Sequence, residues 1–486
     1  MEFWVVLILY VVAVLLVGLL SARRASRSSG EYFLAGRSLG TVVLFMALFG
    51  TNTTPFVLIG IPGIAYHQGV GIFSVNAPIV ALGIPLTFWA IGSPARRMGA
   101  RLGAMTPAEL FAKRFDSRWV GYVLFLFFAF YTLPYMVTAV DGAAQTLEVV
   151  TEGAVPEWQG GFGVLAIALL YTSFGGMRAT AWTNVLQGTL FLGFMVAMFF
   201  LVPASMGGFE EATRKVTEAN PNLLTMGTEG LFEPRAFASW GLAISLTVIA
   251  FPHMLVRLMA ATSERSLKNI CRIYPIALAL LWVPAVMLGL WGAALIPGLE
   301  GRESDRVFAE VITTALPPWL TAVGFLAVIA AVMSTLDAQI LTLGSMVTRD
   351  VIGDAQTVHS GARDVRLTRI SGLVVSVAVF TWWRVGGSSI FDIAAIAFSG
   401  YVTLAPTLFL GVRWRRFTAP GAIASILVGN LVYVWALSGT DWNARAAGWL
   451  GFLPVFWAFF AAALVAIVVS HATHKQSDSS LQRAFG

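Results

Sequence analysis

Apolar stretches separated by short polar segments follow one another along this 486-residue chain. Most of them are close to the roughly 20 residues that an α-helix needs to cross the hydrocarbon core of a bilayer. Thirteen can be marked, at residues 3–20, 41–61, 71–91, 120–140, 160–174, 182–202, 237–256, 273–295, 319–346, 370–384, 390–410, 419–437 and 449–469. The pattern predicts an all-α membrane protein with about 13 transmembrane helices.

Two of these stretches are interrupted by residues that break helices. Gly50-Thr-Asn-Thr-Thr-Pro55 lies near the middle of the second stretch, and Ala250-Phe-Pro-His253 lies in the seventh. Unpaired backbone groups inside a membrane are tolerated only where they face protein or a water-filled cavity, and there their carbonyls can coordinate an ion. An ordinary proline kink is the alternative interpretation, above all for Pro252.

The position of the two breaks indicates an internal repeat. The interrupted stretches are five spans apart and would cross the membrane in opposite directions. Spans two to six and seven to eleven would then form two inverted five-helix repeats, with a binding site between them, as in many secondary transporters. The predicted organisation is an N-terminal extra helix and loop, a first repeat, a second repeat, two C-terminal extra helices and a polar tail, at residues 1–40, 41–202, 237–410, 411–470 and 471–486.

Composition and charge agree with this class. Apolar residues make up 57% and charged residues 12% of the chain, whereas soluble domains contain about 25% charged residues. The net charge is +6, but 24 of the 31 Lys and Arg residues fall in alternate loops. Because cytoplasmic loops carry the excess of Lys and Arg, we expect a multi-pass protein of the cell (inner) membrane with the N-terminus outside and the C-terminus in the cytoplasm. The basic charge is thus a topology signal and indicates no nucleic-acid partner.

Several function classes lack the residues they need. Cys271 is the only cysteine, and of five histidines only His253 lies within a span, so clustered ligands for a metalloenzyme or haem protein are missing. No P-loop and no segment for a nucleotide-binding domain are present. The sequence therefore predicts a transporter and not an enzyme, with no soluble partner evident. A membrane sensor built on a transporter body is an alternative, although the 471–486 tail is too short for a signalling domain.

Five blocks of residues resemble, in the same order, those of the sodium:solute symporter family. They are Tyr32-Phe-Leu-Ala-Gly-Arg-Ser-Leu-Gly40, Ile61-Pro-Gly-Ile-Ala-Tyr-His-Gln-Gly69, Leu170-Tyr-Thr-Ser-Phe-Gly-Gly-Met-Arg-Ala179, Phe251-Pro-His-Met-Leu-Val-Arg257 and Ala330-Ala-Val-Met-Ser-Thr335. The resemblance implies the leucine-transporter fold with extra helices at both ends. It also implies symport of a small organic solute with Na⁺, nearest to sodium:pantothenate symporters, with monocarboxylate and proline carriers close by.

The resemblance also implies a sodium site. Na⁺ is a hard cation that binds oxygen, and hydroxyls with helix-break carbonyls supply oxygens without a buried charge. Carried over residue by residue, the ligands are the side chains of Ser334 and Thr335 and the carbonyls of Ala331, Gly50 and Thr53. The residues alone leave another interpretation open, in which both hydroxyls bond only to their own helix. No cofactor besides the coupling Na⁺ is expected.

Three positions depart from the family's usual residues. Asn52 stands in the break where several relatives carry Asp, and Asn184 stands where most relatives carry Asp. Asp337, one turn after Ser334 on the same predicted helix face, replaces a small polar residue. The missing charge at Asn184 keeps proton-coupled and exchange modes open. Our hypothesis is that Asp337 supplies that charge, with a passing cation as its partner. The alternative is that Asp337 is a solvated charge in the cytoplasmic vestibule.

The remaining candidates concern the solute. An organic anion such as pantothenate or a monocarboxylate fits the resemblance, and helix N-termini at the breaks suit a carboxylate. Candidates for the solute cavity are Asn52, Thr54, Asp141, Gln145 and Phe251. Asp141 and Gln145 are one turn apart, and a solvated position at the outer interface is an equal alternative for them. Arg257 is a candidate for the inner gate.

Overall fold

The computed structural model describes residues 2–24, 28–54, 56–353, 361–386, 390–437 and 450–486. In that part of the chain every regular element is a helix, and the one β-bridge joins Leu39 to Ala261. The helices are α1 (Glu2–Arg24), α2 (Ser29–Leu34), α3 (Thr41–Asn52), α4 (Ile61–Gln68), α5 (Gly71–Thr87), α6 (Ser93–Arg101), α7 (Pro107–Phe115), α8 (Arg118–Val150), α9 (Glu157–Ser205), α10 (Phe209–Ala219), α11 (Pro234–Ala250), α12 (Pro252–Met259), α13 (Glu264–Leu295), α14 (Val307–Ala315), α15 (Pro318–Met346), α16 (Gly361–Val385), α17 (Ile390–Val402), α18 (Ala405–Arg413), α19 (Ala419–Leu437), α21 (Pro454–Ala472) and α22 (Asp478–Phe485). Short π-helical turns follow three of them, namely η2 (Phe56–Gly60), η3 (Phe88–Gly92) and η7 (Val347–Ile352).

The membrane crossings match the apolar pattern. Among the described residues, 10 helices are long and apolar enough to cross a bilayer, or up to 12 crossings with two bent pairs included. One of the 10, α9, has 49 residues and would be about 73 Å long if straight, which is more than twice the hydrocarbon thickness of about 30 Å. If α9 is counted as two crossings, the 12 crossings become 13, which is the number that the apolar pattern predicts.

The change of direction in α9 takes place at one residue. Gly176 has φ 54° and ψ −148°, a backbone conformation that residues other than glycine rarely adopt. A Cβ atom built there would lie 2.5 Å from the carbonyl oxygen of Tyr32 in α2. The loop predicted at residues 175–181 is therefore reduced to a sharp turn at Gly176 between the two helical segments of α9, and α2 packs directly against that turn.

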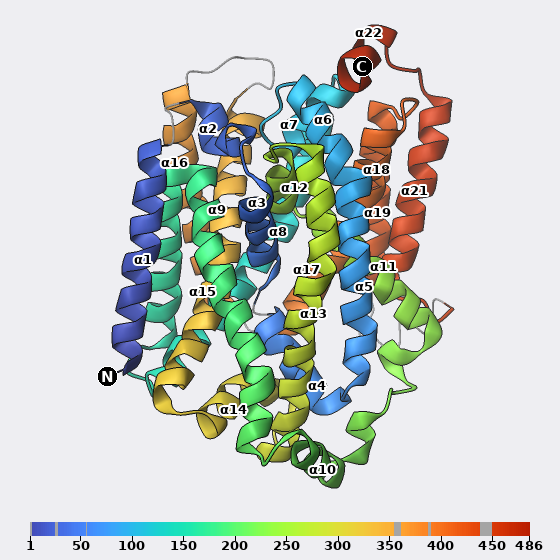
Figure 1. Ribbon diagram of the computed structural model, residues 1–486. Helices are drawn as coiled ribbons and strands as arrows, with labels where there is room; N and C mark the ends of the chain where they lie inside the picture. The colour runs from blue at the N-terminus through green and yellow to red at the C-terminus, as the bar shows by residue number, and fades with distance from the viewer. Residues whose placement is uncertain (1, 25–27, 55, 354–360, 387–389, 438–449) are drawn as a thin grey trace.

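The two predicted breaks are real bends. α3 and the segment Phe56–Gln68, which comprises η2 and α4, meet at 58°, and α11 and α12 meet at 55°. Figure 1 shows α3 and α12 in the interior of the bundle, and α15 packs against both of them. A proline kink does not describe the first bend, because extended backbone at Thr53 separates its two helices.

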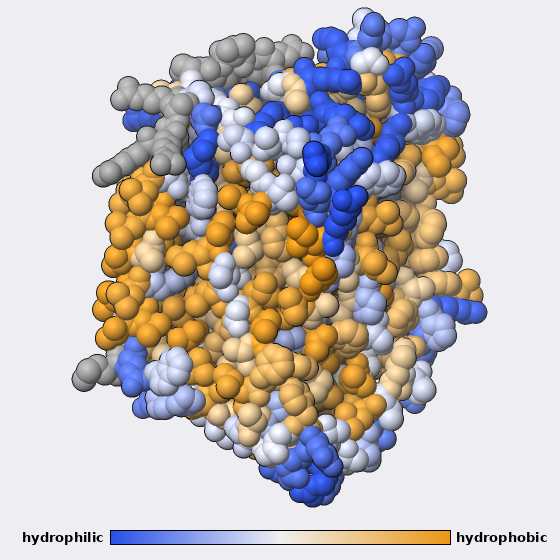
Figure 2. All heavy atoms as spheres, viewed as in Figure 1, coloured by the Kyte–Doolittle hydropathy of each residue, from blue (hydrophilic) through white to orange (hydrophobic). Residues whose placement is uncertain are grey.

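The surface follows the same plan. On the face shown in Figure 2, an apolar band lies between two polar ends. The N-terminal end of α1 and the C-terminal end of the chain lie at opposite ends of the bundle (Figure 1), as an odd number of crossings requires. The short helices α6, α7 and α22, which follow or lie within the basic loops, are at the same end as the C-terminus.

Candidate functional site

The end of α3 presents carbonyl oxygens that its own helix does not use. The last carbonyls of any α-helix lack an intrahelical N–H partner, and α3 ends at Asn52 because Thr53 is extended, with φ −86° and ψ 102°. The backbone N–H of Thr53 donates to the carbonyls of Phe49 and Gly50, and its hydroxyl donates to the Phe49 carbonyl at 2.9 Å. The Gly50 and Thr51 carbonyls remain directed toward α15.

Ser334 and Thr335 of α15 meet these carbonyls. The Ser334 hydroxyl lies 2.8 Å from the Gly50 carbonyl and 2.7 Å from that of Ala331. The Thr335 hydroxyl lies 3.2 Å from both the Thr51 and the Ala331 carbonyls. Both hydroxyls thus contact their own helix and the break in α3 together. We call these two hydroxyls and three carbonyls the oxygen cluster.

Two details of this cluster differ from the sequence-derived set. The Thr51 carbonyl, which the sequence did not suggest, is part of it. Thr53 is buried one residue beyond the end of α3, and no hydrogen bond within the described chain joins its carbonyl to the cluster. Because the backbone after Asn52 is extended, its carbonyl directions could not be read from the sequence.

Asn184 of α9 joins the same region. Its amide nitrogen lies 2.9 Å from the Thr51 hydroxyl and 3.2 Å from the Ser334 carbonyl. The Thr51 hydroxyl donates to the same Ser334 carbonyl at 3.1 Å. Its amide oxygen is buried and makes no hydrogen bond to the described residues. Close contact is possible because Gly50 faces Asn184, where an added Cβ would be 3.4 Å from the Asn184 Cβ.

Asp337 has a protein partner. Its Oδ1 lies 3.4 Å from a guanidinium nitrogen of Arg257 in α12, with side-chain exposures of 0% and 1%. Tyr171 and Thr183 donate to Oδ2 at 3.0 and 3.3 Å, and Arg257 also donates to the Ala47 carbonyl of α3. Asp337 is buried, so the alternative of a solvated charge is wrong. Its partner in this structure is Arg257 rather than a passing cation, and the hypothesis that it supplies the charge that Asn184 lacks stays a prediction. A carboxylate this deep requires a counter-charge, and Arg257 provides it.

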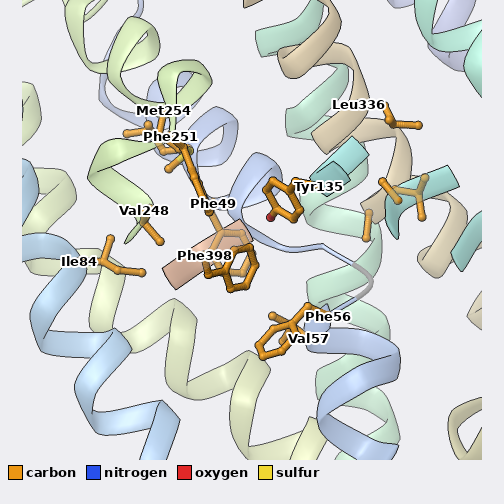
Figure 3. Close-up of a cluster of buried hydrophobic side chains, with 14 of the residues drawn as sticks. Phe49, Phe56, Val57, Ile84, Tyr135, Val248, Phe251, Met254, Leu336 and Phe398 are labelled. Atoms are coloured by element: carbon orange, nitrogen blue, oxygen red, sulfur yellow. The ribbon is translucent and has the colours of Figure 1, made fainter. Parts of the chain in front are cut away.

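A small cavity of about 40 Å³ lies beside the two breaks, which is room for one or two water molecules. Three of the solute candidates, Asn52, Thr54 and Phe251, line it together with Thr53 and Thr247. Its other walls are mostly apolar, and Figure 3 shows aromatic and aliphatic side chains converging there. The side chains described around this cavity are Asn52, Thr53, Thr54, Phe56, Val57, Val80, Ile84, Tyr135, Ile244, Thr247, Val248, Phe251, Leu278, Leu281, Trp282 and Phe398, none of them charged.

Asp141 and Gln145 lie elsewhere. They line a second cavity of about 490 Å³, toward the end of the bundle that holds α14. Gln145 donates to one Asp141 oxygen at 3.0 Å and Trp383 donates to the other at 3.0 Å. The pairing of the two residues was predicted from their spacing. They do not line the central cavity, and their position at the outer cavity agrees with the alternative interpretation of the pair. The 33-residue helix α8 carries them beyond Tyr135, which lines the central cavity.

A buried ion network at the opposite end was not anticipated from the sequence. Arg349 of η7 holds both oxygens of Glu109 in α7, at 3.1 and 3.0 Å, and Asp364 of α16 at 2.8 Å. Lys113 adds a contact to Glu109 at 2.7 Å. Burial alone would raise the pKa of Glu109, but Arg349 and Lys113 outweigh that effect and hold the pKa below its usual value. From the sequence, only the contact between Glu109 and Lys113 could have been predicted, because these two residues are four apart on one helix.

Comparisons with known proteins agree with this architecture. The model of the sodium:solute symporter family matches residues 32–429. The sodium/proline symporter of Escherichia coli K12 is 26% identical over 498 residues, covering 98% of this chain and 94% of its own length. The sodium/pantothenate symporter of the same organism is 28% identical over 437 residues, covering 88% and 89%.

Solved structures show the same fold. A Na⁺-coupled sialic acid symporter in a substrate-bound outward-open state superposes with a TM-score of 0.81 at 17% identity, over 98% of this chain and 99% of the other. A transporter of the nucleobase-cation-symport-1 family superposes with a TM-score of 0.59 at 16% identity, over 94% and 98%. The predicted leucine-transporter-like fold is confirmed.

Proposed function

The chain belongs to the sodium:solute symporter family, and we propose that it imports a small organic solute together with Na⁺ by alternating access. It is a transporter and not an enzyme. The observation that carries the proposal is the oxygen cluster, in which two hydroxyls of an unbroken helix meet the carbonyls of a broken one.

The proposed ligands of Na⁺ are the five oxygens of the cluster, namely the hydroxyls of Ser334 and Thr335 and the carbonyls of Gly50, Thr51 and Ala331. The Thr53 carbonyl, which the family resemblance implies, is proposed as a further ligand. Each hydroxyl now donates its one hydrogen to a carbonyl. If that hydrogen rotates away, the hydroxyl oxygen and the carbonyl oxygen to which it donated can both bind a cation. The C-terminal end of α3 adds a partial negative charge, so a monovalent cation is favoured without a carboxylate in the cluster.

The proposed solute is a small organic anion such as pantothenate or a monocarboxylate. Proline and pantothenate, which are named for the two relatives above, both carry a carboxylate. With no charged side chain among the described lining of the central cavity, the carboxylate would be met by Thr54, Thr247, Asn52 and the N-terminal end of α12, which begins next to Phe251. The apolar walls would hold the rest of the solute once the cavity has widened, because its volume of about 40 Å³ in this state admits only one or two water molecules.

We place the inner gate at Arg257. This guanidinium joins the Ala47 carbonyl of α3 to Asp337 of α15, and Asp337 lies one helical turn after Ser334 of the oxygen cluster. The two helices that form the cluster are thereby held together, and Na⁺ release toward Asp337 requires the contacts of Arg257 to separate. Asp337 would keep near the ion path the negative charge that Asn184 lacks.

Uptake into proteoliposomes tests the coupling. Labelled pantothenate, proline and lactate are offered with a Na⁺ gradient, with a proton gradient and with neither. The double variant Ser334→Ala, Thr335→Ala removes two ligands worth about 1.5–3 kcal/mol each, so the Na⁺ concentration for half-maximal uptake should rise at least about tenfold. Ser345→Ala is the matched control, because the one hydrogen bond described for this buried hydroxyl goes to the Thr342 carbonyl of its own helix.

Three results would contradict the assignment. Undiminished Na⁺-driven uptake in the double variant would remove the oxygen cluster as the coupling site. Uptake driven equally well by a proton gradient would favour the proton-coupled alternative. Binding of a labelled solute without transport in any gradient would favour the sensor.

A further inference from the structure

An apolar groove opens on the outer surface of the bundle, away from the central cavity. Its volume is about 340 Å³, which is within the range of small-molecule pockets, about 300–1,000 Å³. Helices α5, α11, α18 and α21 form it, through Leu86, Leu246, Phe409 and Ala463 among others. Leu86 and Phe409 are 61% and 44% exposed, so the groove is open toward the surrounding membrane. We call it the α5–α21 groove.

A cation lies at one end of this groove. Arg413, the last residue of α18, donates from Nε to the carbonyl of Ala90 at 2.8 Å, and Ala90 is part of the groove lining. Its guanidinium carbon lies 5.4 Å from the centre of the Trp89 ring, and Trp89 is 51% exposed. A second guanidinium nitrogen reaches the Trp89 carbonyl at 3.5 Å. In the described contacts the remaining nitrogen, Nη1, has no acceptor and stays available to an anion.

The depth of this pair fits a lipid headgroup. Trp and Arg side chains are typical of the membrane–water interface, where an indole lies at headgroup level. Arg415 and Arg416 follow Arg413 in the same short loop, at the end of the bundle that holds the C-terminus. That end is the one predicted to face the cytoplasm, whose leaflet is rich in anionic lipids.

We propose that the α5–α21 groove binds one acyl chain of an anionic phospholipid whose phosphate is held by Arg413. An acyl chain gains little by leaving bulk lipid for an apolar groove, because both surroundings are hydrocarbon. The groove therefore accepts any phospholipid, and the charge at Arg413 decides which one stays. The bound lipid would contact α11 at Leu246, four residues before the break that lines the central cavity.

The chain contains a matched control for the headgroup contact. Arg118 lies over the ring of Trp119 at 5.5 Å, at the start of α8 and at the same end of the bundle, and Trp119 is 60% exposed. This pair repeats the Arg–Trp arrangement, but no described hydrogen bond joins it to the lining of the α5–α21 groove, whereas Arg413 is joined to that lining through the Ala90 carbonyl. A purely surface attraction of anionic lipid would treat both pairs alike.

Native mass spectrometry of the full-length protein in detergent tests the proposal, with dioleoyl-phosphatidylglycerol and dioleoyl-phosphatidylcholine as probes. We expect one phosphatidylglycerol to be retained preferentially, and Arg413→Gln to weaken its binding about fivefold, as expected for one interfacial cation, without affecting phosphatidylcholine. Arg118→Gln should change neither lipid. Ala463→Phe fills the groove and should weaken both, which keeps the test decisive if Arg413→Gln fails to fold.

The proposal would be overturned by equal retention of the two lipids by the unchanged protein, by an equal loss of phosphatidylglycerol in Arg118→Gln and Arg413→Gln, or by full retention in Ala463→Phe. Displacement of the lipid by glycerol phosphate alone would show that the headgroup binds without the groove, and would also refute the proposal.

Discussion

Replacing Asp337 by Asn tests the buried ion pair with the smallest possible change in shape. The amide oxygen can still accept the hydrogen bonds of Tyr171 and Thr183, so the substitution removes mainly the charge. Arg257 is then left 1% exposed, with the Ala47 carbonyl as its remaining described acceptor. We expect loss of stability and severe weakening of Na⁺ activation, because the guanidinium contacts both helices of the oxygen cluster.

The size of the effect follows from the geometry. At the observed 3.4 Å, Coulomb's law with an effective dielectric constant of about 20 gives an attraction of about 5 kcal/mol. Measurements on buried pairs agree, since removing one partner costs about 3–5 kcal/mol, whereas removing both charges together is often nearly neutral. The free energy of unfolding should therefore fall by about 3–5 kcal/mol in Asp337→Asn and similarly in Arg257→Gln, and by much less in the double variant.

The assay is unfolding of the purified protein in detergent, measured for the two single variants and the double variant, beside Na⁺-dependent uptake. Asp141→Asn is the matched acid-to-amide control. That carboxylate is only partly buried and lies at the outer cavity, so its loss should cost about 1 kcal/mol or less. Adding Asn184→Asp to Asp337→Asn should partly restore Na⁺ activation, because it returns one negative charge to the same region.

Additive losses in the double variant would refute the reasoning, because they would show that Arg257 and Asp337 do not interact. A harmless Asp337→Asn would refute it as well. If adding Asn184→Asp gave no gain over the single variant, Asp337 would have a purely structural role.

Three further predictions concern other parts of the molecule. Gly176→Ala should abolish the folded protein in membranes, because the new Cβ would lie 2.5 Å from a carbonyl oxygen at φ 54°. Gly163→Ala, where nothing lies within 4 Å, should be tolerated in the same expression assay, and equal yields would contradict the account. Because the folded-state pKa of Glu109 is lowered, its contribution to stability is complete above its ordinary pKa of about 4.3 and is lost as the pH falls through the lower, folded value. Thermal unfolding scans should show this acid-side loss in the unchanged protein and a flatter profile in Glu109→Gln, and identical profiles would rule the contribution out. A reporter fused to the C-terminus should be active in the cytoplasm and one fused to the N-terminus outside, and a periplasmic C-terminus would overturn the orientation drawn from the basic loops.

Features set by neighbouring residues were predictable from the sequence. The crossings follow from apolar runs of the right length, and both bends lie where glycine, proline and polar residues interrupt such runs. The hydrogen bond between Asp141 and Gln145 follows from their spacing of one helical turn. The role of Gly176 could not be seen, because its backbone conformation depends on the contact with Tyr32 of another helix.

The sequence by itself determined that this chain crosses a membrane as a helical bundle with two broken helices, because the bilayer imposes length and hydrogen-bonding rules on each segment separately. Only the tertiary structure decided which polar groups meet. Asp337 and Arg257 are 80 residues apart, and Glu109 and Arg349 are 240 apart, yet each pair shares one buried contact. No local pattern encodes such pairs, because a charge in a membrane helix needs a partner but does not specify which helix supplies it. Packing of α12 against α15 makes that choice for Asp337.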